Sequence, residues 1–230
     1  MNDTQVREIE SARRSREFTN EHPAPFPARS HGASLVIELQ ADIIVVEEQA
    51  ALQMAAMLDR QESTEQKRIG MVSLRAQLRA ISQTARSMDG QLPGTAEQFK
   101  MPRGGDQATI NLGRAYLINA TPIAGEFISR NLPETFLADL QATLDSIAAA
   151  DNRQSQALSA LTAATAAIAV TLKRIRQIIR ELDTIIRNHY RDDPATLAAW
   201  RSASRVEKAP KRAKAGDPPP SAPPSTPPSA

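Results

Sequence analysis

The stretch that decides the fold runs from Leu137 to His189 and reads LADLQATLDSIAAADNRQSQALSALTAATAAIAVTLKRIRQIIRELDTIIRNH. One series of positions in it advances by alternating steps of three and four residues, and most of these positions are apolar. A repeat of this kind, held over many turns, is typical of helices that pack on other helices. We therefore expect an all-α protein, an antiparallel helical bundle with long heptad-patterned helices. The positions are Leu137, Leu140, Leu144, Ile147, Asp151, Gln154, Leu158, Leu161, Thr165, Ile168, Leu172, Ile175, Ile179, Leu182, Ile186 and His189.

A polar group interrupts this repeat at Asp151-Asn-Arg-Gln154. It predicts a hinge at residues 150–156, where two antiparallel helices of a bundle hairpin would join. The alternative is one unbroken helix of 53 residues. That helix would be about 80 Å long at ~1.5 Å per residue, which is long for a domain of this size. The sequence does not decide between one helix and a hairpin.

A second apolar pattern of helical spacing covers residues 34–89. Every residue from Asp59 to Arg68 is polar, so this region is either one long helix with a polar middle or two helices that share a bend. Gly and Pro residues then predict a loop at about 90–106. The apolar residues are Leu35, Ile37, Ile43, Ile44, Val46, Ala50, Met54, Met57 and Leu58 before the polar middle, and Met71, Leu74, Leu78, Ile81, Ala85 and Met88 after it.

Residues 34–203 form the expected bundle domain, because they are numerous enough to bury a core. Asp193 and Pro194 predict the start of a short helix that ends near residue 203. Leu197 and Trp200 lie three residues apart on this helix and are suited to dock it on the bundle.

The two ends of the chain differ from the bundle domain in composition. Residues 1–33 are charged and then broken by three prolines, and we expect a flexible arm there. Residues 204–230 are first basic and then proline-rich, with eight of the 16 prolines of the chain at or beyond Pro210. Such a segment cannot bury enough apolar surface to fold, so we expect a disordered tail.

The composition excludes several kinds of chemistry. The chain has no cysteine, which rules out disulfides, thiolate nucleophiles and cysteine-bound metals. His189 is the one histidine outside the N-terminal arm, and no phosphate-binding loop or nucleophile motif occurs. We therefore expect no metal, no cofactor and no enzymatic activity. The N-terminus lacks the apolar segment of a secretory signal, which predicts a cytoplasmic protein.

The longest uncharged stretch, Gln154 to Leu172, approaches the length of a membrane-spanning helix. A span needs about 20 predominantly apolar residues, whereas this stretch consists mostly of Ala, Thr, Ser and Gln. We therefore expect an alanine-rich helix packed in a soluble protein and no membrane span.

The C-terminal part of the repeat is its most apolar part. It offers more apolar edge than one partner helix within the chain would cover, and we expect it to act as a packing and oligomer seam. The function that follows is a non-enzymatic scaffold or protein-interaction module that self-associates or binds a protein partner. The seam residues are Leu172, Ile175, Ile179, Leu182 and Ile186.

Charge is distributed unevenly along the chain. Residues 1–172 hold 16 basic and 20 acidic side chains, whereas residues 173–214 hold 12 basic and five acidic ones. A basic segment can bind nucleic acid or another anionic surface through phosphate groups, without reading a sequence. This is the alternative function. Its candidate anion-binding residues are Lys173, Arg174, Arg176, Arg180, Lys208, Lys211, Arg212 and Lys214.

Residues 188–210, NHYRDDPATLAAWRSASRVEKAP, contain a short block from Asp193-Pro194 to Pro210. This block resembles the C-terminal block of uncharacterised bacterial hypothetical proteins, which also look like helical chains that end in a charged, proline-rich tail. The resemblance implies a bacterial source. It implies no activity and no mechanism.

Overall fold

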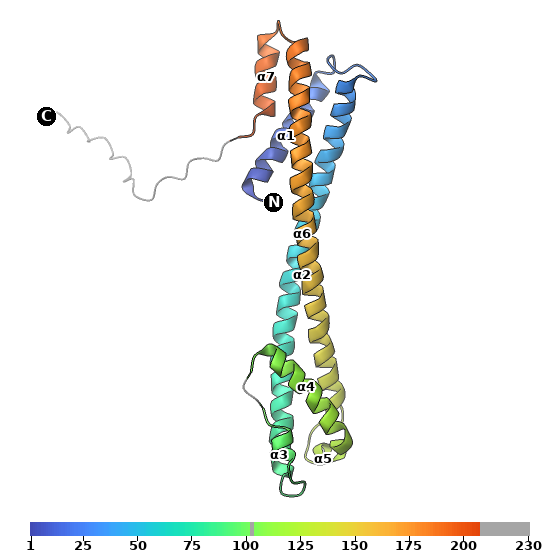
Figure 1. The fold of residues 1–230 in the computed structure, drawn as a ribbon, viewed down its shortest axis with the longest axis vertical. Coiled ribbons are helices and arrows are strands. Elements are labelled where there is room, and N and C mark those ends of the chain that lie inside the picture. The colour runs from blue at the N-terminus through green and yellow to red at the C-terminus, as the bar shows by residue number, and fades with distance from the viewer. Residues whose placement is uncertain (102–103, 208–230) are drawn as a thin grey trace, which may run out of the picture.

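The computed structural model describes residues 1–101 and 104–207, and the regular structure of these residues is entirely helical, as the sequence predicts. Two long helices, α2 (His31–Met88) and α6 (Phe136–His189), lie side by side and form the axis of the molecule (Figure 1). Their side-chain contacts show that they run in opposite directions. The side-chain amide of Gln53 donates to Thr165, whereas that of Gln77, later in α2, donates to Thr143, which comes earlier in α6.

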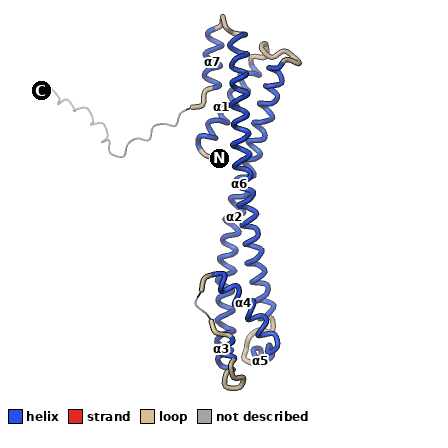
Figure 2. The backbone as a smooth tube through the Cα atoms, viewed as in Figure 1, coloured by secondary structure: helices blue, strands red, loops and turns tan. Residues whose placement is uncertain are grey.

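The shorter helices gather at the two ends of this pair, and each end has a hydrophobic core of its own (Figure 2). The upper core surrounds Trp200 and the lower core surrounds a group of aromatic rings that includes Tyr116. The upper core is completed by α1 (Asp3–Glu21) and α7 (Pro194–Ser204), and the lower core by α3 (Thr95–Gln98), α4 (Asp106–Ala120), the 3-10 turn Thr121–Ile123 and α5 (Ala124–Ile128).

The hinge predicted at residues 150–156 is absent, since α6 passes through them as one continuous helix. Its polar residues face the polar middle of α2. Asp151 forms an ion pair of 2.6 Å with Lys67, and Gln154 donates to the hydroxyl of Thr64 over 3.3 Å. The two polar stretches are therefore opposite each other in an antiparallel pair, and each satisfies the other without a break in either helix. For the same reason α2 is one helix without a bend at its polar middle.

The prediction of a flexible arm at residues 1–33 is wrong, because α1 is a packed helix. Its start is a capping box, in which Asn2 accepts from the amide of Gln5 while the Gln5 side chain accepts from the amide of Asn2. Ile9 and Phe18 are buried in the upper core. The face that packs is otherwise built from small residues, which gives the segment a polar composition although it is folded. These are Ser11, Ala12, Ser15 and Thr19.

The short C-terminal helix is confirmed as α7. Asp193 caps it by accepting from the amides of Ala195 and Thr196, and Pro194 occupies its first position. Trp200 is fully buried and its indole N–H donates to Asp183 of α6 over 2.9 Å. The tail predicted for residues 204–230 lies largely outside the described residues, which end at residue 207.

The loop predicted at about 90–106 contains the one-turn helix α3. Asp89 organises its start, because its carboxylate accepts from the amides of Gly94 and Ala96. Phe99 then inserts into the lower core, where its carbonyl accepts from the hydroxyl of Tyr116. Residues 90–99 of this loop are therefore held by Asp89 at their start and by the lower core at Phe99.

Candidate interaction surface

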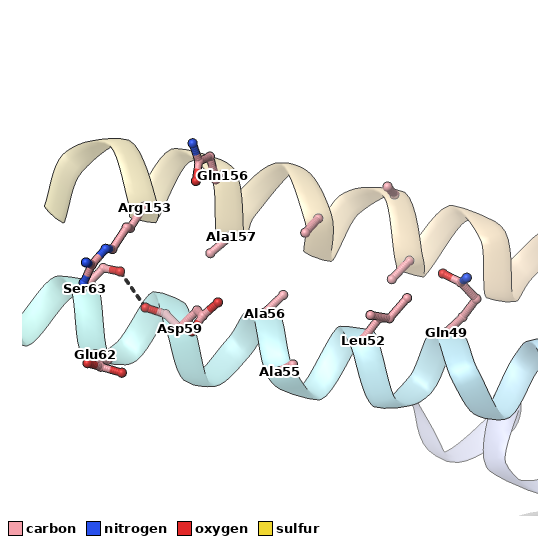
Figure 3. Close-up of a pocket in the computed structure, with 13 residues that line it drawn as sticks. Gln49, Leu52, Ala55, Ala56, Asp59, Glu62, Ser63, Arg153, Gln156 and Ala157 are labelled. Carbon is pink, nitrogen blue, oxygen red and sulfur yellow. Dashed lines mark hydrogen bonds between the residues drawn. The ribbon is translucent and has the colours of Figure 1, made fainter. Parts of the chain in front are cut away.

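Between the two cores, α2 and α6 form a two-helix stalk, comprising residues 47–69 of α2 and 150–167 of α6. Of these residues, Ala50 alone packs against a core, the upper one. The buried residues of the stalk are small and recur every seven positions, as expected where two helices approach closely. Figure 3 shows Ala56 of α2 and Ala157 of α6 pointing toward each other. The buried residues are Ala56 and Ser63 on α2, and Ala150, Ala157 and Ala164 on α6.

The repeat that the sequence predicts for α6 is displaced by one residue in the stalk. Ala157 and Ala164 are buried where Leu158 and Thr165 were expected, and Leu158 is half exposed. The alanines allow the two helices to approach, whereas a leucine at the same place would hold them apart. The larger side chains therefore lie on the flanks of the stalk, where no other helix of the described chain covers them.

One flank of the stalk is hollowed into a groove of about 590 Å³. Its walls are largely apolar, with Leu52 and Ala55 on α2 facing Ala160 and Ala163 on α6. Charged and amide groups lie toward its ends, as Figure 3 shows for Arg153 and Gln49. The groove adjoins a longer row of exposed residues on α2.

That feature is a row of exposed residues along the outer face of α2, which we name the outer stripe. Its residues follow steps of four and three, the same pattern that a coiled-coil interface shows. The side chains of Ile37, Leu58 and Ile69 are 70%, 59% and 56% exposed, and nine of the twelve positions are apolar. The outer stripe comprises Ile37, Ala41, Ile44, Glu48, Ala51, Ala55, Leu58, Glu62, Glu65, Ile69, Val72 and Ala76, all of them exposed.

Sequence reasoning missed the outer stripe because it merged two faces of one helix. Ile37, Ile44 and Leu58 were assigned to the same broad apolar face as Leu35 and Ile43. The structure separates them, since Leu35 and Ile43 are buried in the upper core while the other three face outward. A check for a second series with steps of three and four would have found it, because both series share the period of the helix.

The five seam residues lie in the upper core of their own chain. Leu172, Ile175, Leu182 and Ile186 are buried there, and Ile179 is partly buried against the same core. Helices α1, α2 and α7 surround this part of α6. The apolar edge that the sequence predicts is thus covered by three helices of the same chain, and it leaves little surface for a second chain.

The structure separates the candidate anion-binding residues into three groups. Arg174 pairs with Glu38 and Asp42 of α2, each over 3.1 Å, and Arg176 pairs with Glu8 of α1 over 3.4 Å. Lys173 and Arg180 are exposed and form no ion pair with the described residues. The other four, Lys208, Lys211, Arg212 and Lys214, lie outside the described residues.

Asp42 is the one buried acidic residue of α2, and its surroundings are electrostatically unfavourable. Burial raises the pKa of its carboxyl above the usual range, the neighbouring Glu38 raises it further, and Arg174 only partly opposes this. The Arg174 side chain is itself more than half exposed, so water weakens its attraction for the carboxylate.

Two general features complete the surface. Among the described residues, no group of three or more His, Asp or Glu side chains is placed to hold a metal ion. By length and composition α6 is apolar enough to cross a membrane, with a mean hydropathy of 1.4 over an 18-residue window of which 22% is buried. A helix that is covered on one side only, as α6 is in the stalk, meets the same two criteria.

Comparison with known proteins gives no relative: no protein-family model, no curated protein and no solved structure matches this chain.

Proposed function

We propose that this protein is a non-enzymatic interaction module, a helical rod that binds another protein through the outer stripe of α2. The observation that carries the proposal is the stripe itself, which keeps a coiled-coil pattern over residues 37–76 although no helix of the described chain covers it. These 40 residues correspond to about 60 Å of helix at ~1.5 Å per residue. Soluble proteins seldom expose a largely apolar row of residues of this length unless it binds a partner.

The two long helices suit a scaffold because they connect both cores without a break. α6 has 54 residues, which corresponds to about 80 Å. Two antiparallel helices that share a heptad-spaced contact resist bending better than a single helix or a loop. A partner bound along α2 would therefore be held at a defined position relative to both ends of the rod.

We propose a cytoplasmic protein and a protein partner, with no membrane span. In the antiparallel pair of α2 and α6, the uncharged stretch of α6 lies against the part of α2 between Gln53 and Thr64. Gln53 donates to Thr165, and Gln154 donates to Thr64. This part of α2 contains exposed Asp59 and Glu62. Moving such charges into a bilayer costs several kcal/mol each, so the pair of helices α2 and α6 as a whole is unsuited to a lipid environment.

Site-specific photocrosslinking in the source cells tests the proposal. A benzophenone amino acid at position 58 places the reactive group on the outer stripe, where we expect a covalent adduct with a protein. The matched control has the same amino acid at position 159, because Ser159 is also exposed but lies on α6 of the same stalk, off the outer stripe. The proposal is wrong if position 58 gives no protein adduct, or if both positions give the same adducts.

The alternative, binding of nucleic acid or an anionic surface by residues 173–214, is favoured by Lys173 and Arg180, which are exposed and form no ion pair within residues 1–101 and 104–207. Its signature is a steep loss of binding as salt is added. We expect a chain that ends at Val206 to bind much more weakly, because the four basic residues beyond it are removed. Binding that survives both salt and truncation would contradict the alternative.

A further inference from the structure

We infer that the occupant of the outer stripe is the outer stripe of a second copy of this chain, packed antiparallel in a two-fold symmetric dimer. The inference rests on the proposed function and specifies its partner. The argument for a second copy is the order of residues along the stripe. When a second stripe is laid on the first in the reverse direction, the two sets of side chains fit each other. A symmetric interface requires this property, because residue i contacts residue j of the partner and residue j contacts residue i.

One register brings two of the large apolar residues together. It places Ile44 opposite Ile69 of the partner subunit, and the two-fold axis then passes between Ala55 and Leu58. The same register pairs a large residue with a small one in the remaining apolar layers, as close packing of two helices requires. These layers are Ile37 with Ala76 of the partner subunit, Ala41 with Val72 of the partner subunit, and Leu58 with Ala55 of the partner subunit.

The residues beside the stripe support this register through their charges. In the heptad arrangement of an antiparallel pair, Glu47 lies beside Arg68 of the partner subunit, and symmetry repeats this pair. Both side chains are available, since the Glu47 side chain is 44% exposed and that of Arg68 is 65% exposed. Each already has one partner in its own chain, Arg13 for Glu47 and Glu65 for Arg68. Pairs of opposite charge at these flanking positions select partner and orientation in coiled coils.

The area of the stripe suits a dimer. A strip about 60 Å long and ~10 Å wide, the diameter of a helix, offers on the order of 600 Å² for each chain. Stable complexes bury about 800 Å² per partner. The groove beside Leu52 and Ala55 adds a concave surface along the same edge of α2. A parallel arrangement is disfavoured, because Glu48, Glu62 and Glu65 would each face their own copy.

The antiparallel register has two kinds of unfavourable layer. Glu62 lies opposite Ala51 of the partner subunit, and a second layer, which identifies the register, has like charges. Glu48 lies opposite Glu65 of the partner subunit, so two layers of like charge flank the axis. Glu48→Lys converts both layers into pairs of opposite charge, and Glu65→Lys does the same. The double variant restores like charges, now of two lysines. We therefore expect each single substitution to tighten the dimer about tenfold at low salt, and the double variant to lose this gain.

Sedimentation of the purified full-length chain tests the inference. We expect twice the chain mass of 25.0 kDa for the natural protein and a folded monomer for Leu58→Asp, because Leu58 contributes to no core. Val170→Asp is the matched control: Val170 is 70% exposed on α6 and lies off the outer stripe, so its dimer should persist. Circular dichroism establishes that each variant is folded.

Three results would overturn the inference. The first is a natural protein that is still monomeric at about 100 µM, roughly 1,000-fold above the dissociation constant of a tight dimer. The others are a Leu58→Asp variant that still dimerises, and single and double lysine variants that do not differ in the expected way. The proposed function fails separately. A monomeric chain whose position 58 crosslinks to another protein refutes the dimer alone, whereas a chain that neither dimerises nor crosslinks refutes both.

Discussion

Trp200 offers the sharpest test of the fold, because one side chain joins three helices of the upper core. It is fully buried on α7, its ring lies 5.2 Å from that of Phe18 on α1, and its N–H donates to Asp183 on α6. Replacing a buried Trp by Ala costs about 3–5 kcal/mol. For a chain of this size that corresponds to a decrease in Tm of roughly 6–20 °C.

The loss should be confined to one end of the molecule. The upper and lower cores share no buried residue and are separated by the stalk. We therefore expect Trp200→Ala to increase amide hydrogen exchange in α1 and α7. Exchange in α4, which carries Tyr116 of the lower core, should stay unchanged. Circular dichroism at 222 nm gives the Tm, and exchange followed by mass spectrometry locates the change.

Trp200→Phe serves as the control that separates packing from hydrogen bonding. The ring contact with Phe18 is largely kept while the bond to Asp183 is lost, so the cost should fall to about 1–3 kcal/mol. The reasoning is refuted if Trp200→Ala lowers Tm by less than about 2 °C, which is below 1 kcal/mol, or if exchange rises equally in α4 and in α1.

Further predictions concern single residues. A Cβ on Gly70 would lie 2.7 Å from Ile147, whereas one on Gly125 meets nothing within 4 Å; Gly70→Ala should therefore cost about 1–3 kcal/mol and the matched Gly125→Ala should not lower Tm. Because burial raises the pKa of Asp42, its ionised form destabilises the fold; Asp42→Asn should raise Tm at pH 7, and this gain should shrink as pH falls through that pKa. An equal gain at every pH would contradict it. Ile179→Asp should cost at least about 2 kcal/mol, measured by urea unfolding, without changing the mass in sedimentation.

The helix class and several helix ends were predictable because they depend on local sequence. The repeat of α6 and the Asp193-Pro194 start of α7 contain the information that forms them. The fold of α1 was not predictable in this way. Its Ser11 hydroxyl donates to the carbonyl of Ser204, 193 residues away, and a polar segment that packs against a distant helix looks like a solvated one.

The stalk shows that contacts between distant residues also decide whether a helix is continuous and which of its faces is exposed. Asp151 predicted a hinge when considered alone, whereas in the folded chain it pairs with Lys67 and α6 is continuous there. Ile44 and Ile43 are neighbours in the sequence, yet one faces water and the other the upper core. Which of two apolar faces is covered depends on the helices that remain to cover it, and those are known only from the folded chain.

The two cores also differ in when they can form during synthesis of the chain. The lower core is assembled from residues 71–147, a nearly contiguous segment. The upper core needs Ile9 and Trp200 together, so its first helix can pack fully only after Trp200 has left the ribosome. Domains generally fold as their residues emerge. The apolar face of α1 is therefore the part of this protein that stays unprotected longest, and it is where a nascent chain would most need a chaperone.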